Sequence, residues 1–155
     1  FNLWNTEDKA RRDDKGFEFV YSAKRAIDGF NQKRNNKMEA IDVYLFEHLQ
    51  PQSHLDCPVH SETPGMMIDR LSILSLKIYH MGLQLKRSDV DEAHLAMCSE
   101  KLDILNEQRN QLEACLHTLI DEILQKKRTF RLYRQCKMYN DPKLNPELYQ
   151  PKAIV

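Results

Sequence analysis

The sequence is poor in the residues that interrupt helices. Its 155 residues include only 4 glycines and 6 prolines, whereas ordinary usage is about 7% and 5%. Few turns can therefore break the secondary structure, which favours long helices. No stretch approaches the roughly 18 uninterrupted apolar residues that a membrane-spanning helix needs. We therefore expect no membrane span.

An excess of one charge is also absent. The 23 Lys and Arg residues balance 23 Asp and Glu residues, so no overall field attracts nucleic acid, and we expect no nucleic-acid partner. The 4 cysteines form no CxxC pair, which favours a reduced, cytoplasmic setting. The motifs GxGxxG, GxxxxGK[ST], GxSxG and HExxH are missing, so nucleotide-binding folds and common hydrolases lose their usual support.

Apolar residues at intervals of three and four predict three long helices. The first covers residues 17–49, and the second runs from 64 to about 86, with Thr63 as its N-cap. The third follows a capping box at residues 88–91 and continues to Ile123. Residues 1–13 predict a short helix that carries Trp4. The expected fold is all-α: an antiparallel bundle of three long helices with short terminal helical pieces and a proline-containing, wrapped C-terminal tail over residues 133–155.

Two arginines, Arg34 and Arg109, interrupt the apolar stripes of the first and third helices. A buried guanidinium needs a carboxylate or an anionic ligand at its own height. In an antiparallel hairpin of helices two and three, positions whose numbers sum to about 177 lie level, so we predict that Asp69 and Arg109 lie within ion-pair or one-water distance. Arg34 is expected beside Asp69 or nearer His80. An open cavity at Asp69 and Arg109 would indicate a ligand pocket, whereas a closed ion pair would indicate a network that fixes helix register.

The remaining polar clusters leave alternatives open. His54, Cys57 and His60 are competent metal ligands, but they lack a second ligand pair, so we expect no metal site and no cofactor. His80 is either a satisfied core histidine or an acid–base group. The basic stretch 126–137 is either a solvated helix end or a patch that faces phosphate or a partner.

Four stretches, residues 23–42, 62–81, 101–112 and 133–149, resemble the signature segments of a bacterial family known as a domain of unknown function. Genes of that family often lie among lipopolysaccharide and glycosyltransferase genes. The resemblance implies an all-helical cytoplasmic protein linked with surface-glycan assembly, and it brings no established reaction. It also implies one helical domain over residues 1–155 that lacks an upstream N-terminal helix. Its motif positions include Asp28, Asn31, Arg34, Asn35, Asp69, Arg70, Lys77, His80, Arg109, Arg134, Lys137, Tyr139, Asn140 and Asp141.

We therefore expect a polar site near the start of the second helix, whose free N–H groups favour an anion. The tail should fold back toward residues 63–65 and bring its basic residues there. The expected ligand is an anionic, phosphosugar-like molecule or an envelope-glycan enzyme such as a glycosyltransferase, with a homodimer as one option. The alternatives are a small all-helical enzyme that uses Arg, Asp, Lys and His, and a structural interaction module. The candidate ligand-binding residues are Arg34, Asn35, Asp69, Arg70, His80, Arg109, Arg134, Lys137 and Tyr139.

Overall fold

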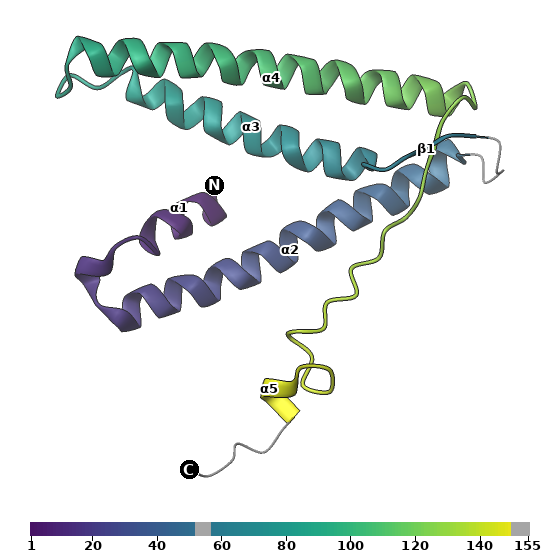
Figure 1. Cartoon of the computed structure of the whole chain (residues 1–155), viewed down its shortest axis with the longest axis horizontal. Coiled ribbons are helices and arrows are strands. Elements are labelled where there is room, and N and C mark those ends of the chain that lie inside the picture. The colour runs from purple at the N-terminus through teal and green to yellow at the C-terminus, as the bar shows by residue number, and fades with distance from the viewer. Residues whose placement is uncertain (52–56, 150–155) are drawn as a thin grey trace.

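The computed structural model describes residues 1–51 and 57–149, and within these residues the fold is all-α, as predicted (Figure 1). Helices account for nearly all of the regular structure, and two short strands pair with each other. No helix within these ranges is apolar enough over a sufficient length to cross a membrane. The elements are α1 (Asn2–Lys9), a 3₁₀ turn η1 (Asp13–Lys15), α2 (Phe17–Leu49), β1 (Val59–His60), α3 (Pro64–Gln84), α4 (Glu92–Leu124), β2 (Thr129–Phe130) and α5 (Pro146–Tyr149).

Local sequence signals set most helix ends. Gly16, with a φ of 82°, reverses the chain before α2, a conformation that side chains rarely adopt. Thr63 is the N-cap of α3, and its hydroxyl accepts a hydrogen bond from the backbone N–H of Met66. The expected capping box before α4 is not used in that form. Instead Asp91 caps α4 by accepting a 2.8 Å hydrogen bond from the backbone N–H of His94.

The three long helices do not close into one bundle. The α3–α4 hairpin is antiparallel, whereas α2 meets α3 at one end and diverges from it (Figure 1). The α1 helix folds back onto α2, where Ala10 packs with Ala23 and Ile27. It also reaches α3, because the Phe1 and Tyr79 rings lie 5.2 Å apart. The expected bundle is therefore replaced by two diverging hairpins with α1 between α2 and α3.

The main core lies where α2 ends, α3 begins and α4 ends. Its buried members are Met67, Leu112, Leu119, Ile123 and Phe130, and Leu45, Phe46 and Leu49 of α2 pack against them. The β1 and β2 strands pair in parallel at this end, with Val59 opposite Thr129. Sequence patterns predicted no strand at either segment, and residues 129–130 lay in the basic stretch 126–137, for which a solvated helix end was one alternative. Their pairing fixes the chain before α3 beside the chain after α4.

An internal carboxylate occupies the N-terminus of α3. Asp42 of α2 is only 5% exposed, and its carboxylate accepts hydrogen bonds from the Thr63 hydroxyl at 2.5 Å and the Gly65 N–H at 2.6 Å. Burial raises the pKa of Asp42, although these two hydrogen bonds oppose the rise. The anion expected at this positive helix end is therefore supplied by the chain itself.

The C-terminal tail follows α2 and does not turn toward residues 63–65. Arg134 donates a 2.7 Å hydrogen bond to Glu39, and the Gln135 amide donates to the Asn35 carbonyl at 2.8 Å. The hydrogen bond from Arg134 holds the pKa of Glu39 below its usual value. The expected return of the tail to residues 63–65 is therefore wrong, because Glu39 holds Arg134, and Asp42 accepts the hydrogen bonds at the start of α3.

Candidate functional site

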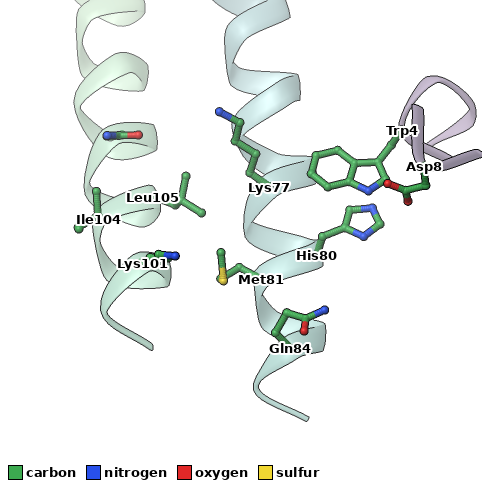
Figure 2. A pocket seen from close by; sticks show the side chains of 10 residues that line it. Trp4, Asp8, Lys77, His80, Met81, Gln84, Lys101, Ile104 and Leu105 are labelled. Carbon is green, nitrogen blue, oxygen red and sulfur yellow. The ribbon is translucent and has the colours of Figure 1, made fainter. Parts of the chain in front are cut away.

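A cavity of about 550 Å³ lies between α1, α3 and α4, and we call it the α1 cavity (Figure 2). A neighbouring hollow of about 470 Å³ lies on the α2 side of α1, and Trp4 and Asp8 line both spaces. Arg34 and Asn31 of α2 line the second hollow. The α1 cavity is lined by Trp4, Asp8, Lys77, His80, Met81, Gln84, Lys101, Ile104, Leu105 and Gln108.

The position of α1 depends on aromatic contacts with α3. The Trp4 and His80 rings stack face to face, with centroids 4.2 Å apart and planes inclined by 6°. The stack places the indole at the wall of the α1 cavity (Figure 2). A flat apolar ring is thus held rigidly where a bound molecule could pack against it.

Two lysines from neighbouring helices line the α1 cavity. Lys77 shares one face of α3 with His80 and Gln84 at helical spacing, and Lys101 shares one face of α4 with Leu105 and Gln108. Their side chains extend toward the space between the two helices (Figure 2). Within residues 1–51 and 57–149, neither ammonium has a carboxylate oxygen within 4.0 Å. Both charges are therefore available to an anionic ligand.

His80 adds a hydrogen-bonding group that the fold does not use. Its Nε2 atom is buried and has no hydrogen-bond partner among the residues that the structure describes. A neutral histidine presents one donor and one acceptor nitrogen, and which nitrogen carries the proton depends on its partners. His80 can therefore donate to a ligand or accept from it. Asp8 is the carboxylate that lines the same cavity.

The polar layer predicted from the apolar stripes is partly present. Asp69 forms its ion pair with Arg34, with Nε and Oδ1 3.3 Å apart, which matches one of the two positions expected for Arg34. No ion pair or direct hydrogen bond joins Asp69 and Arg109. Arg109 instead donates to the neighbouring Asn110 at 3.1 Å, and its Nε atom is buried without a hydrogen-bond partner in the described chain.

The other candidate residues are spread over the molecule. Arg70 points outward and donates to both carboxylate oxygens of Glu62, at 2.8 and 2.9 Å. Asn35 contributes its backbone carbonyl to the tail contact, and Lys137 and Tyr139 lie further along the tail. His80 is thus the candidate that lines the α1 cavity, and Arg34 lines the adjacent hollow.

His80 is the one residue of the ten that line the α1 cavity to have been singled out as ligand-binding from the sequence; the aromatic and charged residues that were missed are Trp4, Asp8, Lys77 and Lys101. Trp4 and Asp8 have no local signal, because their role depends on how α1 docks. The approach of Lys77 to Lys101 could have been predicted, because the antiparallel register that placed Asp69 level with Arg109 also places these two lysines at one height.

The candidate metal cluster can be described only in part, because His54 lies outside the described residues. Cys57 is buried, and its thiol lies 3.8 Å from the Lys126 carbonyl oxygen, to which it donates. The His60 Nδ1 atom lies 2.6 Å from the Glu62 carbonyl oxygen. No group of three metal-competent side chains occurs in the part of the chain that the structure describes.

Fold and cavity together define an all-helical protein with a lysine-lined, aromatic-walled cavity between helices. The family model described as "Protein of unknown function (DUF4254)" matches residues 1–132, and the chain belongs to this family. The predicted membership in a domain family of unknown function is thereby confirmed. The chain matches no curated protein and no solved structure.

Proposed function

We propose that the α1 cavity binds an anionic, phosphosugar-like small molecule. The observation that carries this proposal is the pair Lys77 and Lys101, two ammonium groups from different helices that line one cavity without an internal carboxylate partner in the described chain. A phosphate group placed between them would receive charge-assisted hydrogen bonds from both. A cavity of about 550 Å³ falls within the size range of small-molecule sites.

The other lining groups favour a sugar as the remainder of the ligand. The indole of Trp4 offers an apolar face to the C–H groups of a sugar ring. Asp8, Gln84 and Gln108 provide the acceptors and donors that hydroxyl groups need. His80 adds its unpaired Nε2 atom. Phosphate and sugar would thus be recognised by different walls of the same cavity.

The biological setting belongs to the same proposal. The resemblance to a bacterial family encoded among lipopolysaccharide and glycosyltransferase genes supports a cytoplasmic role in surface-glycan assembly. Phosphorylated sugars are the building blocks of such glycans, so the ligand class and the setting agree. A glycosyltransferase that takes or delivers the ligand is the partner that this role would require.

Catalysis is the second candidate function, and one observation favours it. His80 and Asp8, which could transfer protons, line the same cavity as the two lysines. A bound phosphosugar that is chemically changed on incubation with the protein would indicate an enzyme. A purely structural module is supported by the closed Arg34–Asp69 ion pair, and it would show no ligand binding at all.

Trp4 makes the binding proposal directly testable, because it is the chain's 1 tryptophan. Its fluorescence would be followed while glucose 1-phosphate, glucose or inorganic phosphate is added. We expect a saturable change with glucose 1-phosphate at lower concentration than with either part alone. Lys77→Gln and Lys101→Gln should each weaken binding about tenfold or more, since each removes a hydrogen bond to a charged group.

The matched control is Lys24→Gln, which changes an exposed lysine of α2 that lines none of these spaces. It should bind like the wild type. The proposal would be refuted by an absent response to glucose 1-phosphate. It would also be refuted if all three lysine variants weakened binding equally, because that would reflect general charge attraction.

A further inference from the structure

The tail beyond Gln135 is an ordered segment that stands apart from the helices, and we call residues 136–149 the arm (Figure 1). Its turns are stabilised from within. Asp141 accepts a hydrogen bond from the Lys143 N–H, and Asn145 accepts one from Glu147 at the start of α5 while donating to the Tyr139 carbonyl. Within the described chain, no hydrogen bond or ion pair joins the arm to α1, α2, α3 or α4.

Large apolar side chains of the arm are about half exposed to water. Five large side chains are between 47% and 60% exposed, namely Met138, Tyr139, Leu144, Leu148 and Tyr149. Local hydrogen bonds already fix the shape that presents them, so docking would cost little further ordering. Several large apolar side chains exposed on one short, preformed segment favour a protein–protein contact.

The accessible area of the whole chain leaves room for such a contact. The accessible surface is 11401 Å², whereas a compact monomer of 18.4 kDa would expose about 8200 Å². The excess is about 3000 Å², which is comparable with the roughly 2000–5000 Å² that obligate dimers bury in total. The chain therefore has enough uncovered surface for a stable dimer.

An apolar hollow of about 390 Å³ lies at the junction of α2, α3 and α4, where Leu45, Leu49, Ile68, Leu116 and Ile120 line it. The chain's own arm leads away from this hollow, because the tail passes Glu39 and then Asn35 on its way toward the N-terminal half of α2. If the α2 helix of a second copy lay antiparallel to α2 of the first, the C-terminal half of that second helix and the hollow next to it would lie beside the arm of the first copy.

We propose that the arm docks into this hollow on a second copy of the chain, so that two chains exchange arms in a homodimer. Leu144 and Leu148, four residues apart, are the apolar anchors. Charge is complementary, since Lys143 adjoins Leu144 and Asp121 lines the hollow. The net charge of zero means that two copies do not repel each other at long range. The exchange is reciprocal, as a twofold axis requires.

Light scattering after size exclusion would measure the mass of the intact chain at micromolar concentration. We expect two chains per particle, and one chain per particle in the double variant Leu144→Ser with Leu148→Ser. Circular dichroism of that variant should remain that of the wild type, because both side chains are about half exposed and neither belongs to a core cluster. Met97→Ser is the matched control, since Met97 is a 42% exposed apolar residue near the start of α4, outside the arm, α2 and the hollow, and this variant should remain dimeric.

A second variant tests the acceptor. Ile120→Glu in the hollow should also give monomers, and mixing it with the arm variant should restore a dimer joined by one arm, weaker than the wild type. A monomeric wild-type chain would overturn the proposal. So would a dimer that persists in the arm variant, because the two copies would then associate through another surface.

Discussion

Gly65 is the residue at which the packing of α2 on α3 can be tested most sharply. A Cβ atom added there would lie 2.6 Å from the Met38 carbonyl oxygen and 2.7 Å from the Asp42 Cγ and Oδ1 atoms. The Met38 oxygen belongs to the α2 backbone, so it cannot turn aside as a flexible side chain would. In Gly65→Ala the two helices must therefore move apart, which would lengthen the 2.6 Å hydrogen bond from the Gly65 N–H to Asp42.

The expected loss of stability has three parts. Overpacking costs about 1–3 kcal/mol, and weakening the buried hydrogen bonds of Asp42 costs about 1–3 kcal/mol. Alanine returns up to about 1 kcal/mol through its better helix propensity. We therefore expect Gly65→Ala to lower the free energy of unfolding by about 1–6 kcal/mol.

Urea denaturation followed by circular dichroism would measure this loss. Gly82→Ala is the control on the same helix, because an added Cβ there meets no atom within 4 Å. That variant should gain about 0.5–1 kcal/mol from helix propensity alone. If Gly65→Ala proved as stable as the wild type, α2 and α3 could not be in the close contact described. The Arg34–Asp69 ion pair, which depends on that contact, would then lose its basis.

Two further variants test the carboxylates at the same contact. Asp69→Asn should cost about 1 kcal/mol or less in urea denaturation, because the side chain of Arg34 remains 40% exposed to water; a loss of several kcal/mol would contradict this. Asp42→Asn should remove a pH dependence. Burial raises the pKa of Asp42 above its value in the unfolded chain, so the native protein keeps a proton that the unfolded chain has already lost. The stability of the wild type should therefore fall relative to that of Asp42→Asn as the pH rises from the unfolded-state pKa to the native-state pKa of Asp42. Parallel curves of stability against pH would refute this.

Local sequence patterns predicted the elements that depend on local interactions. The α2 helix has the predicted bounds because its apolar spacing continues without proline from Phe17 to Leu49. Thr63 caps α3 as expected, since a hydroxyl at that position satisfies a free N–H group. The start of α4 was placed near Ser88 because several capping residues follow one another there. The structure selects Asp91.

The polar layer shows which features of side-chain position can be predicted from the register of two antiparallel helices. Counting from the α3–α4 turn gives the height of a residue along the hairpin, but it does not give the direction of its side chain. Asp69 does meet an arginine, yet the arginine comes from α2, whose register was left open by the long loop before α3. Heights within one hairpin were therefore predictable, whereas the choice between Arg34 and Arg109 was not.

The sequence pattern did not predict the end of the core, because that end depends on pairing between distant segments. Phe130 is fully buried, although the apolar pattern fades before it. It is buried because β2 pairs with β1, about seventy residues earlier, and because its ring meets Phe46 at 5.6 Å. Two-residue strands carry no periodicity, so no local pattern could announce them.

The α1 cavity and the arm both depend on contacts that no local sequence pattern predicts. They share no residue, so their tests are independent. Trp4 reaches the cavity only because the chain reverses at Gly16 and stacks its indole on His80. The arm is presented by its own turns at the other end of the chain and contributes no residue to the cavity. Trp4 fluorescence therefore reports ligand binding whether or not arms exchange, and particle mass reports association whether or not a ligand is bound. A monomer that still binds glucose 1-phosphate would refute the exchanged-arm dimer and leave the proposed ligand site standing.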